Sequence, residues 1–167
     1  MGLDATVYKN KRHFLTEAGE LDTDLLCDEE TGQVYPKEET NPKTGEIHPR
    51  EEAFRKYPDR HAYIAKHVRI GNVAAIGQLK YALLCIGVPK DSVMQSKVLY
   101  SGSHCGDMLV AEDIEKLDKE LDSIDSLLSM NRNKLEEQED EKWIVGFRED
   151  MKELIRAARE EGNPIVF

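Results

Sequence analysis

Two stripes of apolar residues in the last third of the sequence constrain the fold of this chain more than any other feature. The first stripe consists of Ile114, Leu117, Leu121, Ile124 and Leu128. The second stripe consists of Leu135, Trp143, Phe147, Met151, Leu154, Ile155 and Ala158. A spacing of three or four residues puts each set on one side of an α-helix, and Ser and Asn residues at 129–133 interrupt the pattern. The sequence therefore predicts an antiparallel helical hairpin over 112–128 and 134–160.

The acidic charge of the chain is concentrated in the same region. Residues 107–167 hold 18 acidic and 9 basic side chains, and the whole chain of 167 residues has a formal net charge of -10. An acidic surface repels a phosphate backbone, whose binding needs clustered Lys and Arg side chains. We therefore expect no nucleic-acid partner, and we expect the outer faces of the helical hairpin to be acidic.

Apolar runs and cysteines bound the class of protein further. The longest uncharged apolar runs, such as 81–88, fall short of the roughly 20 residues that a membrane-spanning helix needs. The opening residues MGLDATVY lack the pattern of a secretory signal. Cys27, Cys85 and Cys105 form no CxxC pair, so we expect neither a disulfide framework nor a zinc ribbon. These features predict a cytoplasmic protein with no membrane partner, no metal and no cofactor.

Shorter patterns predict the other elements of the fold. Alternating and β-branched residues predict strands at 3–8, 13–15, 68–70, 97–100 and 165–167. A helix is predicted from Val73, after Gly71 and Asn72, to Ile86, before Gly87. The predicted fold class is α+β: a small mixed sheet packed by three or more helices, including the long acidic C-terminal helical hairpin. We predict a single domain over 1–167, with a polar, turn-rich excursion at about 16–60.

A short repeat lies inside this excursion. Residues 31–39, TGQVYPKEE, are echoed thirteen residues later by residues 44–52, TGEIHPREE. In each copy Thr-Gly supplies a turn, and Pro followed by one basic and two acidic residues resembles the first turn of a helix. The repeat predicts two similar hairpin or loop units that flank a site, or else it reflects chance similarity among turn-forming residues.

One segment has the plan of a binding site. Residues 97–107, KVLYSGSHCGD, combine a predicted strand, a polar loop with two glycines and the start of a helix. Loops after strands concentrate binding residues, and glycines let backbone N–H groups approach an anion. We predict a binding module for a small polar or anionic ligand at the 101–107 loop. The candidate ligand-binding residues are Arg69, Asn72, Ser101, Gly102, Ser103, His104, Gly106 and Asp107.

The same loop leaves other functions open. One alternative is a hydrolase-type enzyme in which Cys105 or Ser103 is the nucleophile and a distant histidine, such as His61 or His67, is the base. We rank this enzymatic alternative below binding, and Asp107 is also a suitable cap for the next helix. A metal site would combine His104 and Asp107 with histidines from 48–67, at spacings that match no known ligand motif.

Two further alternatives concern charged surfaces. The acidic helices predict a protein-interaction module that docks a protein partner or a second copy of the chain. The basic residues between His48 and Arg69 predict either a site for a small anion or ion pairs with the acidic helices.

Four motifs together resemble a known family. They are MGLDATVY at 1–8, RIGN at 69–72, KVLYSGSHCGD at 97–107 and EGNPIVF at 161–167. In these motifs the chain is similar to a family of uncharacterised bacterial and phage-associated proteins, whereas residues 16–60 and 129–142 are unmatched. The resemblance implies membership of that family, and it implies no activity and no catalytic residues.

Overall fold

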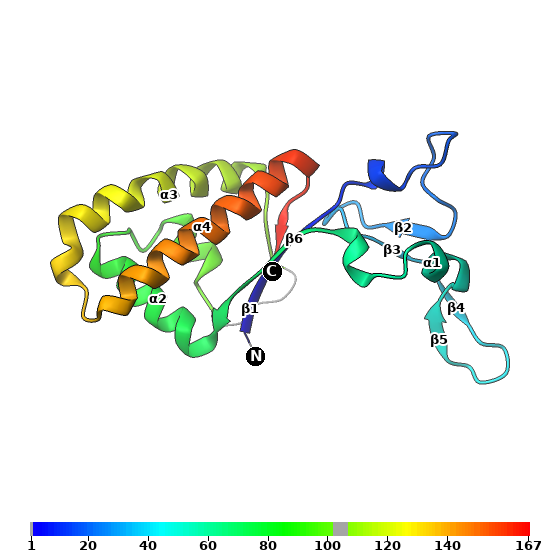
Figure 1. Ribbon diagram of the computed structural model, residues 1–167, viewed down its shortest axis with the longest axis horizontal. Coiled ribbons are helices and arrows are strands. Elements are labelled where there is room, and N and C mark those ends of the chain that lie inside the picture. Colours follow the sequence, from blue (N-terminus) through cyan, green and yellow to red (C-terminus); the bar gives the residue numbers. More distant parts are fainter. Residues whose placement is uncertain (1, 102–106) are drawn as a thin grey trace.

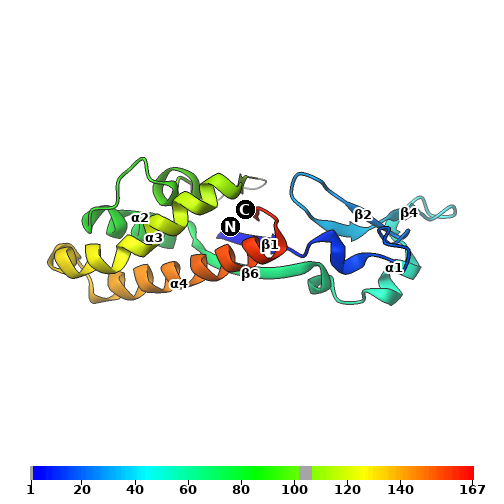
Figure 2. The ribbon, with the colours of Figure 1, turned by 90° about the horizontal axis from the view of Figure 1, so that it is seen from above.

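The computed structural model describes residues 2–101 and 107–167, apart from the side chains of Phe54 and Arg60. Two lobes follow one another along the long axis of the molecule (Figure 1). The main lobe is built from residues 2–8, 64–101 and 107–167, and the small lobe is built from residues 9–63. Figure 2 shows the same separation from above, with the three long helices at one end and the short strands at the other.

The main lobe contains a four-stranded sheet in the order β6-β1-β8-β7. Its strands are β1 (Gly2–Tyr8), β6 (Ile64–Asn72), β7 (Met108–Leu109) and β8 (Ile165–Val166). Each pairing in this sheet is antiparallel, so the prediction of a mixed sheet is wrong. The reason lies in the connections, because β6 returns beside β1 directly from the small lobe and β8 returns beside β1 from the last helix.

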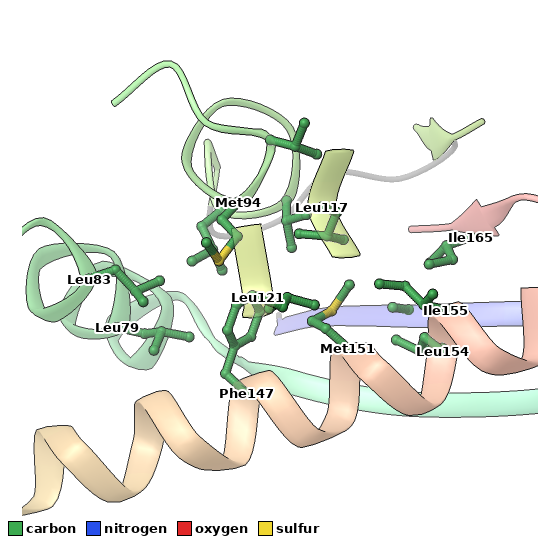
Figure 3. Close-up of a cluster of buried hydrophobic side chains, with 14 of the residues drawn as sticks. Leu79, Leu83, Met94, Leu117, Leu121, Phe147, Met151, Leu154, Ile155 and Ile165 are labelled. Atoms are coloured by element: carbon green, nitrogen blue, oxygen red, sulfur yellow. The ribbon is translucent and has the colours of Figure 1, made fainter. Parts of the chain in front are cut away.

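Three helices cover one face of the sheet, which confirms the predicted α+β class. They are α2 (Val73–Cys85), α3 (Ala111–Asn131) and α4 (Gln138–Glu161). Alternate residues of β1 point toward them, and Leu3, Ala5 and Val7 are fully buried. Figure 3 shows how the apolar stripes of the helices meet the sheet in one core. None of the described helices is long and apolar enough to cross a membrane.

The predicted helical hairpin is formed by α3 and α4, with a 3-10 turn at Arg132–Lys134 between them. At the start of α4 the Asp140 carboxylate accepts the backbone N–H of Glu137 at 3.2 Å in a capping box. Basic side chains of α4 face acidic side chains of α3. These ion pairs join Arg148 to Asp125, Lys152 to Asp118 and Asp122, and Arg159 to Glu115 and Asp118.

The segment predicted as a strand at 97–100 is instead entered through a π-helical turn, Met94–Val98. Its buried apolar residues are Val93, Met94, Val98 and Leu99. Val98 and Leu99 lie five residues after Val93 and Met94, which is the separation that the i to i+5 hydrogen bonds of a π-helix span. The Glu120 carboxylate of α3 accepts the backbone N–H groups of Val93 at 2.8 Å and Met94 at 3.0 Å. Packing and this cap therefore override the local preference for a strand.

The strand predicted at 13–15 is also wrong, because Lys11–Phe14 form a 3-10 turn. Phe14 enters a second apolar cluster, which belongs to the small lobe and is separate from the main core. Its ring stacks on Tyr63 at 5.5 Å and meets the edge of Tyr57 at 5.6 Å between ring centroids. The short helix α1 (Glu51–Lys56) and the 3-10 turn Arg60–Tyr63 complete this lobe.

Each copy of the repeat begins in the turn of a hairpin and continues into the second strand of that hairpin. The two copies end differently, because Glu38–Thr40 form a strand whereas Glu51 begins α1, so the predicted first turn of a helix is wrong for the first copy. Strand β2 (Leu25–Cys27) pairs with β3 (Val34–Pro36), and β4 (Glu38–Thr40) pairs with β5 (Ile47–Pro49). In the first turn the Asp28 side chain accepts two backbone N–H groups, and in the second turn Asn41 does the same. Gly32 and Gly45 close the two turns with φ of 72° and 74°, a backbone region that favours glycine.

The two lobes are joined by hydrogen bonds around the end of α4. The Glu161 carboxylate accepts the backbone N–H of Asn10 at 2.7 Å and contacts the His13 ring at 2.9 Å. The Arg12 side chain donates to the Glu160 carbonyl at 2.6 Å. This junction holds the small lobe beside the C-terminal end of α4.

Candidate functional site

The predicted loop site is only partly described. Gly102, Ser103, His104, Cys105 and Gly106 lie outside the described residues. At its far end, Asp107 accepts a hydrogen bond from the Tyr100 hydroxyl, and this bond raises the pKa of Tyr100. The carbonyl of Asp107 accepts the backbone N–H of Phe167 at 2.9 Å. Asp107 is therefore bonded to the segment that follows the π-helical turn and to the residue that follows β8.

The other two predicted residues lie elsewhere. Arg69 and Asn72 are on β6, and β1 and β8 separate that strand from β7, which follows the loop. The Asn72 side chain accepts the backbone N–H of Ala75 at 2.9 Å and caps α2. The exposed guanidinium of Arg69 lies beside Gly2. The structure therefore does not bring Arg69 and Asn72 together with Ser101 and Asp107.

The basic residues between 48 and 69 pair mainly inside the small lobe. The backbone N–H of Asp24 lowers the pKa of Asp22, and Lys56, which binds the same carboxylate at 2.9 Å, lowers it further. Within this stretch, Lys66 is paired with an acidic residue of the long helices, Glu153 of α4. His67 contacts the Thr6 hydroxyl at 3.0 Å. Among the described residues no group of three or more His, Cys, Asp and Glu side chains is arranged to hold a metal ion.

A pocket of about 290 Å³ lies at the described ends of the loop, between the π-helical turn and β7. Its basic side chain is Lys97, whose ammonium group donates to both carboxylate oxygens of Asp113 at 2.7 Å. The charge that would attract an anion is thus already balanced by a carboxylate.

A second pocket, of about 310 Å³, lies between β6, α2 and the N-terminal half of α4. We call it the Trp143 pocket. It is lined by Ile70, Ala75, Leu79, Lys142, Trp143, Gly146, Phe147 and Asp150. Its walls are mostly apolar and it carries few polar groups, a composition typical of ligand sites.

The Trp143 pocket arises from the way α4 crosses α2. Residues 143, 146, 147 and 150 fall on one strip of α4, because helical residues three and four apart are neighbours. The Gln78 side chain of α2 donates to Asp140 of α4 at 3.3 Å. The Tyr81 hydroxyl donates to Glu136 at 3.0 Å, which raises the pKa of Tyr81 to about 12. These bonds tie α2 to the start of α4 and to Glu136 just before it, beside the pocket. Leu79 of α2 and Phe147 of α4, which line the pocket, also belong to the core that Figure 3 shows.

Asp150 is the acidic group of the Trp143 pocket. Its carboxylate makes no hydrogen bond or ion pair with any other described residue. Burial raises the pKa of Asp150, the charge of Glu153 raises it further, and Lys66 offsets only part of the shift. The neighbouring carboxylate of Glu149 also raises this pKa. Lys66 therefore compensates the ionised form of Asp150 only in part, and a bound cation would supply further positive charge.

Trp143 and Gly146 give the pocket its aromatic wall and its opening. Trp143 is the single tryptophan of the chain, and it is 37% exposed. A Cβ added at Gly146 would meet nothing within 4 Å. A glycine inside a helix costs roughly 0.5–1 kcal/mol relative to alanine, and no contact in the described part of the chain requires it. Its missing side chain leaves the space beside the indole open.

Sequence reasoning assigned Trp143 to the apolar stripe of a helix and did not identify this pocket. A stripe shows which residues share a face, but it does not show that α2 and β6 stop short of covering that face. The available signal was the only tryptophan of the chain, followed by a glycine at the third position and an acidic residue at the seventh.

Comparisons with family models, with curated proteins and with solved structures found no match to this chain. The resemblance to a family of uncharacterised bacterial and phage-associated proteins therefore stays a prediction.

Proposed function

We propose that this chain is a binding module whose Trp143 pocket recognises an organic cation with an apolar body. The observation that carries the proposal is the carboxylate of Asp150, which faces this pocket without a partner among the described residues. An unpaired, partly buried carboxylate favours a bound cation, because the cation replaces the favourable interactions with water that the carboxylate loses on burial.

The aromatic and aliphatic walls support the same class of ligand. Trp143 lines the pocket together with Leu79 and Phe147. An indole attracts a cation over its face, and at an exposed site a contact of this kind contributes about 0.5–1 kcal/mol. The aliphatic floor suits a hydrocarbon group attached to the cation. The overall charge of -10 adds long-range attraction for positive ligands.

Lys142 sets the polarity of the mouth of the pocket. It lines the pocket, it is exposed, and it pairs with no other described residue. Its charge opposes a cationic ligand and favours an anionic one, while Asp150 has the reverse effect. Variants of these two residues therefore report the sign of the ligand charge by changing its affinity in opposite directions.

The test compares three probes of similar shape: cyclohexylammonium, cyclohexanol and cyclohexanecarboxylate. Trp143 fluorescence reports binding directly because the chain has no other tryptophan, and calorimetry confirms the affinity. We expect cyclohexylammonium to bind, with an affinity that decreases as the pH falls through the raised pKa of Asp150. Tighter binding of cyclohexanecarboxylate would instead favour an anionic ligand and overturn the proposal.

Variants separate pocket binding from weak surface attraction. We expect Asp150→Asn to weaken cyclohexylammonium binding by about tenfold or more, the value of a lost charged contact. We expect Lys142→Ala to strengthen it by about twofold to fivefold. Gly146→Ala should weaken it by narrowing the pocket, whereas Gly77→Ala, a matched change at an open helical glycine of α2, should not. An unchanged affinity in Asp150→Asn would contradict the proposal.

A further inference from the structure

A second hollow lies on the other side of Gly146. It has a volume of about 420 Å³ and is lined by Gln138, Glu141, Lys142, Val145, Gly146 and Glu149. We call it the Glu149 hollow. It shares Lys142 and Gly146 with the Trp143 pocket. The two depressions are therefore neighbours on α4, and the ridge between them is low because residue 146 has no side chain.

Each depression holds one carboxylate without a partner in the described part of the chain. Asp150 belongs to the Trp143 pocket and Glu149 belongs to the Glu149 hollow. Most other acidic side chains of the helical hairpin are already used in ion pairs, as Asp118 is with Lys152 and Arg159. Glu141, which also lines the Glu149 hollow, is bound to Arg132 at 2.6 Å. The unpaired negative charge of this surface is thus divided between two adjacent depressions.

We propose that this surface docks an extended peptide segment of a partner protein that carries two arginines, one in the Trp143 pocket and one in the Glu149 hollow. This inference rests on the proposed function, since the first arginine side chain is the organic cation of the Trp143 pocket. A guanidinium is planar, stacks on an indole and pairs with carboxylates. The second arginine adds affinity because it binds at the high effective concentration set by the first.

The position of Lys142 favours a peptide over a linear polyamine. Lys142 lines both depressions, so a chain that crosses between them passes this ammonium group. A peptide backbone is neutral there and offers carbonyl oxygens that accept hydrogen bonds from an ammonium group. A polyamine such as spermidine has an ammonium group between its ends, which Lys142 would repel.

The test uses acetylated and amidated peptides with one arginine, or with two arginines separated by one to four glycines. Citrulline peptides of the same length are the neutral controls, and spermidine is the polyamine probe. Trp143 fluorescence and calorimetry measure the affinities. We expect the best two-arginine peptide to bind about tenfold tighter than the one-arginine peptide, and tighter than spermidine.

Glu149→Gln removes the second contact and acts on the first only through the charge that Glu149 exerts on Asp150. It should reduce the affinity of the two-arginine peptide to that of the one-arginine peptide, and it should lower the affinity for cyclohexylammonium by a much smaller factor. Glu160→Gln makes the same change of charge on an exposed residue of α4 outside both depressions. It should affect neither ligand.

The outcomes separate this inference from the proposed function. If cyclohexylammonium does not bind, the pocket itself is misassigned and both proposals fail. If cyclohexylammonium binds but no two-arginine peptide has more than twice the affinity of the one-arginine peptide, the peptide docking proposal alone is overturned. Spermidine binding as tight as the best peptide would also overturn it, because the occupant would then be a small polycation.

Discussion

Single residues decide the character of the Trp143 pocket, and Asp150 shows this most clearly. The neighbouring acidic residues of α4 and α3 are largely satisfied by ion pairs across the hairpin, such as Arg148 with Asp125 at 3.0 Å. Asp150 is instead partly buried and lies near other carboxylates, and both its burial and their negative charge raise its pKa. A group whose charged form is disfavoured in the folded state reduces stability wherever it is ionised. Asp150 therefore lowers the stability of the free protein at neutral pH.

This residue gives a prediction about pH. The folded-state pKa of Asp150 lies above its ordinary value of 3.8, so its unfavourable contribution is absent at lower pH and grows as the pH rises through the raised pKa. We expect Asp150→Asn to increase the free energy of unfolding at pH 7 and to change it little at pH 3. Chemical denaturation at both pH values measures the difference, with Glu160→Gln as the control. A variant that is less stable than the parent at pH 7 would contradict this account.

At the scale of elements, the long periodic patterns were predictable and the short ones were not. The stripes of α3 and α4 each extend over several turns, so their period of 3.6 is unambiguous, and Gly87 after α2 was a clear stop signal. The run 97–100 was too short to distinguish a strand from the end of a π-helical turn. Its conformation depends on the Glu120 carboxylate, which is distant in sequence.

The candidate site was less predictable than the fold. The Trp143 pocket is made by three elements, and its volume depends on how closely α2 and β6 approach α4. A single sequence specifies the residues of each element, but it does not specify how closely the elements approach one another. Likewise, Arg69 and Asn72 looked like partners of the 101–107 loop, but the strand order places them on the opposite edge of the sheet.

The two hairpins of the small lobe provide a matched pair of substitutions. Gly32 and Gly45 have the same left-handed backbone, so alanine is strained by about 1 kcal/mol at either position. A Cβ at Gly32 would also overlap the Asn163 side chain, whereas a Cβ at Gly45 would meet nothing within 4 Å. We expect Gly32→Ala to lower the melting temperature more than Gly45→Ala. Equal losses in thermal unfolding would show that the Asn163 contact adds nothing.

At the scale of the whole molecule, the two lobes have separate apolar clusters and a polar junction. The Glu161 carboxylate is the centre of this junction and its side chain is 13% exposed. It bonds to Asn10 and His13, while the neighbouring carbonyl of Glu160 accepts a hydrogen bond from Arg12 at 2.6 Å. The position of the small lobe thus depends on a few hydrogen bonds rather than on a shared core.

This arrangement predicts a local effect of mutation. We expect Glu161→Ala to loosen residues 9–14 and to leave the core of the main lobe intact. Hydrogen exchange should become faster at the backbone amides of 9–14, with little change in α3. Glu160→Ala is the control, because its backbone carbonyl still accepts the bond from Arg12. Uniformly faster exchange through both lobes would show instead that the junction stabilises the whole fold.

The insertion of the small lobe between two paired strands also has a consequence for the order of folding. Strands β1 and β6 pair from Gly2 and Asn72 to Tyr8 and Ile64, with all of residues 9–63 between them. Closing a long disordered loop costs conformational entropy, and this cost slows the pairing of distant strands. The two hairpins are held by local bonds, so we expect them to close first and to shorten that loop before β1 meets β6. Strand β1, which precedes the other strands of the sheet along the chain, is thus expected to pair only after the small lobe has folded.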